Sequence, residues 1–209
     1  MHLYFVRHAP TEANLVGKMI NGYSCANIIY DKVKNKDIVD AWNDKVGIYI
    51  PKEARKVIIS SPARRCIQTA ELLFGALPRN LERSLEEFDC SGLGDKKFWE
   101  VSKAEFDSLV DMPTEKMAQK AHKIREMTRN VQEQFKCNAC ILVTHGMVIR
   151  YLYSYFTGNP HVSAYDVINS NNVKFANLDL MKVDSCTGKV ELHYFNPPIN
   201  HVENTNVNQ

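Results

Sequence analysis

Three short runs of mainly apolar residues are the clearest pattern along the chain. They occupy residues 3–6, 57–60 and 141–144 and are rich in β-branched and aromatic side chains. A strand buried on both faces of a sheet shows such an unbroken run, whereas a half-exposed strand alternates between apolar and polar positions. We therefore predict three central, parallel strands in a sheet that is covered on both sides.

A helical pattern follows each of these runs, over residues 10–14, 61–73 and 146–156. Residues 116–135 also place apolar side chains at helical spacing, with charges elsewhere, and predict an amphipathic helix that packs on the sheet. Strands that alternate with helices are typical of α/β domains. The predicted fold is α/β, with three α/β/α layers, a mostly parallel central sheet and a small lid insertion.

The end of the predicted domain, which spans residues 1–200, has a different pattern. Apolar residues alternate over 176–180 and 190–194, on either side of a turn at 185–188. This pattern predicts a hairpin that closes the sheet at one edge. The polar, Asn-rich residues 201–209 predict a flexible tail.

Two segments, residues 24–50 and 90–113, are charged and irregular. We expect them to form excursions over the strand ends, and we place lid segments at 20–50 and 88–115. Residues 20–30 and 90–113 should line the pocket entrance, and their mixture of Tyr, Asn, Lys and Trp suits sugar phosphates, nucleotides and phosphopeptides equally, so the substrate stays open at this point.

The composition excludes several classes of protein. The formal charge of +2 is small, and Lys and Arg are scattered along the 209 residues, which argues against a nucleic-acid partner. The six cysteines lack the density of a secreted disulfide scaffold. No signal-peptide pattern precedes the first run, and no apolar segment approaches the ~20 residues that span a bilayer. We expect a soluble cytoplasmic protein without a membrane partner, and the oligomeric state stays open.

Histidines and arginines follow the three predicted central strands. Arg7 and His8 come after the first strand, Arg64 and Arg65 after the second, and His145 after the third. Ligands of an open α/β sheet bind at the carboxyl ends of the strands, near helix N-termini. Cations in the first turn of a helix oppose its dipole at a cost of about 0.3–1 kcal/mol each, and a bound anion reverses that sign. The pattern predicts a phosphate site.

His8 is the candidate nucleophile of this site. Imidazole attacks phosphorus only when it is unprotonated, and a neighbouring guanidinium such as that of Arg7 favours the neutral ring. His145 could donate a hydrogen bond to the transferring phosphoryl group. Taken singly, a histidine at a strand end is more often structural, and Arg64 and Arg65 are more often a solvated helix face. Their convergence at three strand ends favours the functional interpretation.

Three motifs carry a specific resemblance. Residues 7–14, read R-H-A-P-T-E-A-N, resemble the R-H-x-x-T signature of the histidine phosphatase superfamily, in the branch that holds cofactor-dependent phosphoglycerate mutases and small-molecule phosphatases. Residues 60–70 resemble its S-S-P-x-x-R-A-x-Q-T-A segment, and residues 143–146 resemble its second histidine motif. The three occur in the family's order.

The resemblance implies a role for each matching residue. His8 would be the phosphorylated nucleophile, and Glu87 the general acid, with Glu86 as the open alternative. The residues that would complete the phosphate pocket are Arg7, Arg65 and His145, and those that would add phosphate or substrate contacts are Asn14, Thr11, Gly146 and, as second choice to Arg65, Arg64.

The chain departs from the family pattern in two places. Ala9 stands where a glycine usually follows the first histidine, and residues 92–100 are a looser version of G-x-W-E-G. Cys137 and Cys140 have C-x-x-C spacing, but no second pair completes a zinc site. We therefore expect no metal and no cofactor.

The sequence favours a phosphatase that hydrolyses a phosphomonoester of a small phosphorylated substrate. A phosphoglycerate mutase-like phosphoryl transfer is the first alternative, although mutases of this kind usually carry longer insertions. A non-catalytic phospho-ligand binding module is the second alternative, although a pure binder needs arginines but no acid.

Overall fold

The computed structural model describes residues 1–15, 26–31, 35–94, 96–97, 100–110, 114–158, 165–166 and 175–196. Its centre is a six-stranded sheet in the order β3-β2-β4-β1-β5-β6. Strands β3, β2, β4 and β1 run parallel to one another, while β5 pairs antiparallel with β1 and β6. The strands are β1 (His2–Arg7), β2 (Lys56–Ser60), β3 (Asn80–Leu81), β4 (Ala139–Thr144), β5 (Leu180–Asp184) and β6 (Val190–His193).

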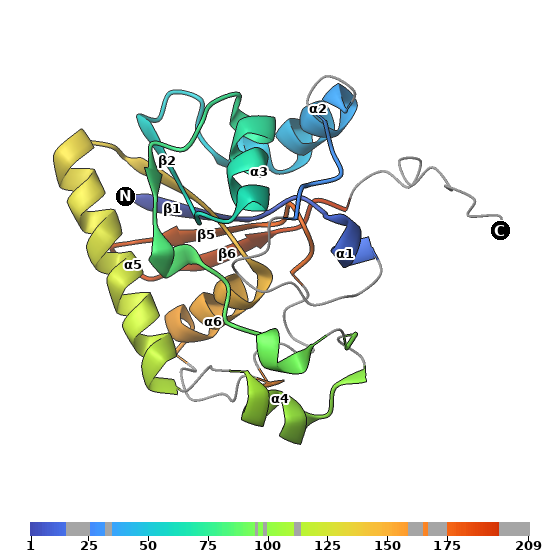
Figure 1. Ribbon diagram of the computed structural model, residues 1–209. Coiled ribbons are helices and arrows are strands. Elements are labelled where there is room, and N and C mark those ends of the chain that lie inside the picture. Colours follow the sequence, from blue (N-terminus) through green and yellow to red (C-terminus); the bar gives the residue numbers. More distant parts are fainter. Residues whose placement is uncertain are drawn as a thin grey trace.

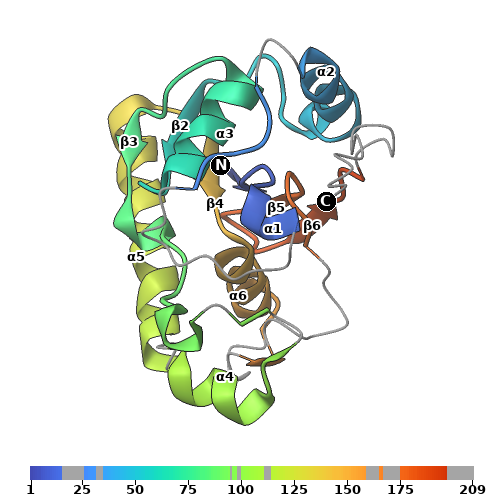
Figure 2. The ribbon, with the colours of Figure 1, turned by 45° about the vertical axis from the view of Figure 1, so that its right-hand side comes forward.

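Helices cover both faces of this sheet. In Figures 1 and 2, α2 and α3 lie on one side of the strands and α5 and α6 on the other. The helices are α1 (Glu12–Leu15), α2 (Lys36–Lys45), α3 (Arg64–Phe74), α4 (Lys103–Leu109), α5 (Thr114–Phe135) and α6 (Gly146–Phe156), and the 3₁₀ turns are η1 (Gly47–Tyr49), η2 (Arg83–Leu85) and η3 (Ser91–Leu93).

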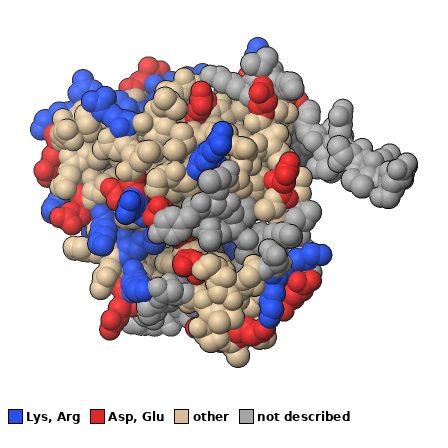
Figure 3. All heavy atoms as spheres, in the orientation of Figure 1, with Lys and Arg blue, Asp and Glu red and all other residues tan. Residues whose placement is uncertain are grey.

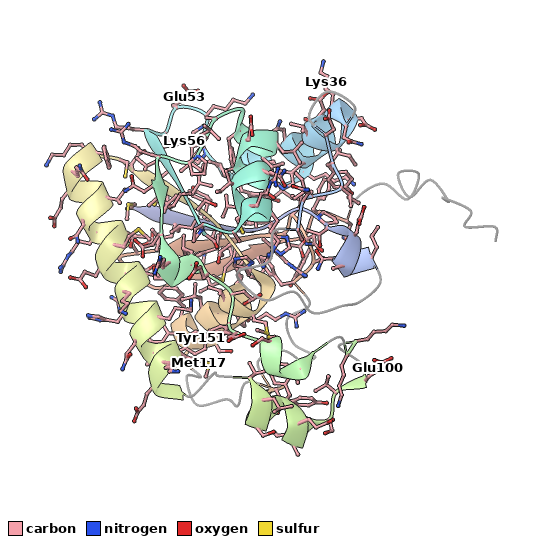
Figure 4. The ribbon with its side chains drawn as sticks, in the orientation of Figure 1. Lys36, Glu53, Lys56, Glu100, Met117 and Tyr151 are labelled. Atoms are coloured by element: carbon pink, nitrogen blue, oxygen red, sulfur yellow. The ribbon has the colours of Figure 1, made fainter. Side chains whose placement is uncertain are left out.

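Alternate residues of the central strands enter two separate cores. Leu3 and Phe5 of β1 pack in the core beneath α5 and α6, whereas Tyr4 and Val6 pack in the core beneath α2 and α3. Every residue of β4 is buried. On the α5 side, Met117 of α5 and Tyr151 of α6 are both fully buried (Figure 4). These two cores confirm the predicted three-layer fold and its unbroken apolar strands.

The helix boundaries correct the prediction after β2. The helix predicted over residues 61–73 starts later, because α3 begins at Arg64 with Ala63 in an extended conformation (φ −60°, ψ 130°) as its N-cap. The Ser61 hydroxyl accepts a hydrogen bond from the Ala63 amide at 3.3 Å and stabilises this turn. Arg64 and Arg65 are therefore the first two residues of the helix.

The predicted hairpin lies at the sheet edge as β5 and β6, but its first strand starts later than expected. Leu178 has a left-handed backbone (φ 67°), so the alternation at 176–179 belongs to a loop and not to a strand. The backbone carbonyl of Leu178 accepts a hydrogen bond from the Trp42 indole at 2.8 Å, and its amide donates to the carbonyl of Arg7. These two hydrogen bonds hold the loop in its bent conformation.

The two predicted lid segments contain regular structure. Helix α2 lies within residues 20–50, and its buried Ile38 and Trp42 belong to the core beneath α2 and α3. This part of the predicted excursion therefore belongs to a helical layer. In the second segment, α4 begins with a capping box between Ser102 and Glu105. The tail at 201–209 lies outside the described residues, and among the described helices none is both long and apolar enough to span a bilayer.

Candidate active site

The pairing of β1 with β4 places two histidines side by side. Arg7 is opposite Thr144 in the parallel register, so His8 and His145 follow at the same level. The His8 amide donates to the Thr144 carbonyl at 3.0 Å, and the two imidazole centroids are 5.3 Å apart in an edge-to-face arrangement. The predicted convergence of these strand ends is therefore present in the structure.

His8 is held in the tautomer that a nucleophile needs. Its Nδ1 is 2.8 Å from the Ala9 carbonyl oxygen, which only accepts, so Nδ1 carries the hydrogen. The neutral ring then keeps a free electron pair on Nε2. Burial lowers the pKa of His8 well below 6.5, and the charges of Arg65 and Arg7 lower it further. The neutral ring is thus the stable form near pH 7.

Arg7 lies against the beginning of α6. Its Nη1 donates to the Phe175 carbonyl at 2.6 Å, and its buried Nε has no hydrogen-bond partner among the described residues. A Cβ added to Gly146 would be only 3.1 Å from this Nε. Burial and then the neighbouring Arg150 lower the pKa of Arg7 to about 10, so it remains a cation at neutral pH. Gly146 gives the guanidinium the room to lie here.

Arg65, His145 and Ser61 form a buried hydrogen-bonded chain. Arg65 Nη2 donates to His145 Nδ1 at 3.1 Å, because a guanidinium has no acceptor. His145 Nε2 therefore carries the hydrogen and donates to the Ser61 hydroxyl at 2.9 Å. Burial, followed by the charge of Arg65, lowers the pKa of His145 well below 6.5. Ser61 was not singled out from the sequence, although it lies within the second motif.

The structure separates the two arginines that follow β2. Arg65 is 1% exposed and lies among the site residues, whereas Arg64 is exposed. Successive residues of an α-helix point about 100° apart, since 3.6 residues complete one turn. Only one of the two can therefore face the histidines, and it is Arg65.

Glu87 lies at the N-terminus of α6. Its Oε1 accepts a hydrogen bond from the Phe88 amide at 3.2 Å, and its Oε2 accepts one from the Met147 amide at 3.4 Å. Burial raises its pKa, while Arg65, these two amides and Lys120 oppose the increase. The raised pKa of this carboxyl therefore comes from its burial.

Thr11 and Asn14 contact one another in the loop after His8. The Thr11 amide and hydroxyl donate to Asn14 Oδ1 at 3.1 and 3.0 Å. Asn177, which the sequence did not indicate, donates from Nδ2 to the His8 carbonyl at 2.8 Å and lies 3.4 Å from the same Asn14 oxygen. These bonds hold the backbone that carries the nucleophile, and a phosphate contact of Thr11 or Asn14 stays a prediction.

The C-x-x-C pair contributes no ligand set. Cys137 and Cys140 are buried free thiols, and burial raises the pKa of Cys140 to about 12. Among the described residues, no group of three or more His, Cys, Asp or Glu side chains is arranged to hold a metal ion.

Comparison with known proteins places this geometry in context. Residues 44–194 match the model of the histidine phosphatase superfamily, branch 1. The matched range includes Arg65, Glu87 and His145, while Arg7 and His8 precede it. No curated protein has a significant sequence match to the chain.

Solved structures with the same fold include two phosphatases. A phosphoserine phosphatase from Entamoeba histolytica, solved with 3-phosphoglyceric acid, has 18% identity and a TM-score of 0.65, and the alignment covers 95% of this chain and 98% of that one. The alpha-ribazole phosphatase from Shigella flexneri has 15% identity and a TM-score of 0.61, with 92% and 95% covered. YhfR from Bacillus stearothermophilus has 17% identity and a TM-score of 0.56, with 91% and 94% covered.

Proposed function

The chain belongs to branch 1 of the histidine phosphatase superfamily, and from this premise we propose that it is a phosphatase that hydrolyses a phosphomonoester through a phosphohistidine intermediate on His8. The observation that carries the proposal is the state of the His8 ring. Nδ1 donates to the Ala9 carbonyl, and burial beside Arg65 and Arg7 keeps the ring neutral, so Nε2 is available to attack.

The surrounding groups supply the remaining chemistry. As His8 Nε2 forms a bond to phosphorus, the ester P–O bond breaks and Glu87 transfers its proton to the leaving oxygen. Arg7 and Arg65 stabilise the charge on the phosphoryl oxygens. Water then attacks the phosphohistidine, its proton returns to Glu87, and phosphate leaves. Arg7 and Arg65 supply the positive charge that a metal would otherwise provide, so the proposed reaction needs no metal or cofactor.

We propose a small phosphorylated molecule as the substrate. The two phosphatases with the same fold are a phosphoserine phosphatase and an alpha-ribazole phosphatase, and both names refer to small compounds. The face drawn in Figure 3 carries Lys and Arg interspersed with Asp and Glu, unlike the one-signed patch of a nucleic-acid binder. A screen of phosphorylated metabolites would identify the substrate.

Rapid quench with a labelled substrate, in the presence of a chelator, tests the intermediate. We expect acid-labile, base-stable label on His8, no label in His8→Ala, and normal labelling in the matched control His122→Ala, which alters an exposed histidine of α5. Label on another residue, with His8→Ala still active, would overturn the mechanism. Return of the label to another hydroxyl of the substrate itself, with little release of inorganic phosphate, would favour a mutase, and phosphate binding without turnover would favour a binding module.

The role of Glu87 is tested by substrates that differ in leaving group. Glu87→Gln should slow hydrolysis of alkyl phosphates by about 10²-fold or more, because an alkoxide needs a proton as it leaves. Hydrolysis of p-nitrophenyl phosphate should change much less, since nitrophenolate leaves without one. Glu86→Gln is the matched control. Equal losses on both substrates, or a larger leaving-group-dependent loss in Glu86→Gln, would remove Glu87 from this role.

A further inference from the structure

Three consecutive backbone carbonyls before Glu87 are bound by side chains from two different elements. Lys120 Nζ of α5 donates to the carbonyls of Ser84 and Glu86 at 3.0 and 2.6 Å. Between them, the carbonyl of Leu85 accepts a hydrogen bond from the Thr144 hydroxyl at 2.6 Å. The peptide that leads to the acid is therefore held from α5 on one side and from the end of β4 on the other.

The ammonium group of Lys120 loses part of its contact with water where it lies. Lys120 lies on α5 between Met117 and Ala121, which are both fully buried, and its Nζ is 5.2 Å from the centre of the Phe88 ring. Burial lowers the pKa of Lys120, while the nearby carboxylates of Glu87 and Glu86 favour its charge. Lys120 is half-buried, and a lysine that loses part of its contact with water needs compensating partners. Here both carbonyl bonds and the aromatic face converge on the segment that carries Glu87.

We propose that Lys120 is a positioning residue for proton transfer, and that together with Thr144 it holds the segment 84–87 so that the Glu87 carboxyl stays against the N-terminus of α6. The inference rests on the proposed function, because it assigns Lys120 to the acid step of that reaction. Thr144 immediately precedes His145, so the same hydroxyl fixes the acid segment relative to the phosphate pocket. Displacement of a catalytic group by about 1 Å can lower the reaction rate by about 10²-fold.

Among the described residues, four cations from four elements face Glu87. They are Arg7 from β1, Arg65 from α3, Lys120 from α5 and Arg150 from α6. Lys120 lowers the pKa of Glu87. The acid acts only when it is protonated, so activity is lost as the pH rises above its pKa. Loss of the Lys120 charge should raise this pKa and move the alkaline limb of the rate profile to higher pH.

The test compares Lys120→Met, Lys120→Arg and the control Lys123→Met, which alters an exposed lysine of the same helix. Lys120→Met should slow alkyl phosphate hydrolysis by about 10-fold or more and p-nitrophenyl phosphate hydrolysis by much less. Its alkaline limb should move to higher pH. Lys120→Arg should retain most of the rate and the original position of the alkaline limb of the pH–rate profile. Lys123→Met should behave as the unaltered protein.

A purely structural role gives a different result. Equal losses on both substrates, an unmoved alkaline limb, or unaltered rates in Lys120→Met would overturn the inference. If Lys120→Met does not fold, Thr144→Val removes the central hydrogen bond and should show the same leaving-group-dependent loss. Glu87→Gln/Lys120→Met should be no worse on alkyl phosphates than Glu87→Gln, and an additive loss would also overturn it. If the loss of rate in Glu87→Gln itself does not depend on the leaving group, the assignment of Glu87 as the general acid is refuted instead.

Discussion

Replacement of Gly146 by Ala should lower activity without lowering stability. The new Cβ would be 3.1 Å from Arg7 Nε and 3.2 Å from its Cζ, closer than the 3.4–4 Å of ordinary contacts. The guanidinium must then move by a few tenths of an ångström, although its Nη1 is held 2.6 Å from the Phe175 carbonyl. The movement misaligns the cation beside His8.

The magnitude follows from the bond that is misaligned. A hydrogen bond to a charged group contributes about 1.5–3 kcal/mol, which corresponds to about 10- to 100-fold in kcat/KM. In the same variant the loss of backbone freedom in the unfolded chain favours folding, while the close contact with Arg7 opposes it, so the free energy of unfolding should change little. Gly146 is not among the residues of positive φ, so Ala fits its backbone in the first turn of α6, and without a close contact such a change stabilises a protein by about 0.4–1 kcal/mol.

The assay measures kcat/KM on an aryl phosphate, vanadate affinity and thermal unfolding for both proteins. We expect weaker vanadate binding and a lower kcat/KM at a Tm close to that of the unaltered protein. An unchanged kcat/KM would refute the proposed contact between Gly146 and Arg7. A parallel fall in Tm would show that the substitution distorts the fold generally.

Two further predictions concern charges. Arg65→Met should reduce kcat/KM by about 10²-fold or more, whereas the control Arg64→Met should remain close to the unaltered protein because Arg64 is exposed; equal kinetic effects would contradict the assignment. Stability should fall as the pH is lowered from 7 to 5, because folded His8 and His145 stay neutral while the unfolded chain takes up protons near 6.5. The slope approaches about 1.4 kcal/mol per pH unit for each histidine as the pH falls below about 6.5. Chemical denaturation measures it, and an undiminished slope in His145→Gln would contradict this account.

The sequence predicted the central strands and their ends well, because burial on both faces leaves an unbroken apolar run. Helix α2 was missed, since only Ile38 and Trp42 of its ten residues are buried and the rest resemble a loop. The later start of β5 was also missed, because the bend at Leu178 depends on contacts with Trp42 and Arg7, which lie far away in the sequence. Local patterns cannot report such contacts.

In the candidate site, too, the residues at strand and helix ends could be predicted, whereas those that depend on contacts distant in the sequence could not. His8, Arg7, Arg65 and His145 could be predicted because each follows a strand or begins a helix at one edge of the sheet. Lys120 could not, because on an amphipathic helix a lysine next to apolar positions usually lies at the solvent boundary. Its importance comes from the Ser84 and Glu86 carbonyls, more than thirty residues away along the chain.

The central place of β1 has a consequence for the order of folding. Its partners in β4 lie 137 positions further along the chain, and those in β5 more than 170. Pairings of such large sequence separation close long loops and form late. His8 is therefore synthesised long before the strands that position it, and a nascent chain that stops before β4 and β5 carries the nucleophile on an unpaired strand, where it has no pocket in which to bind phosphate.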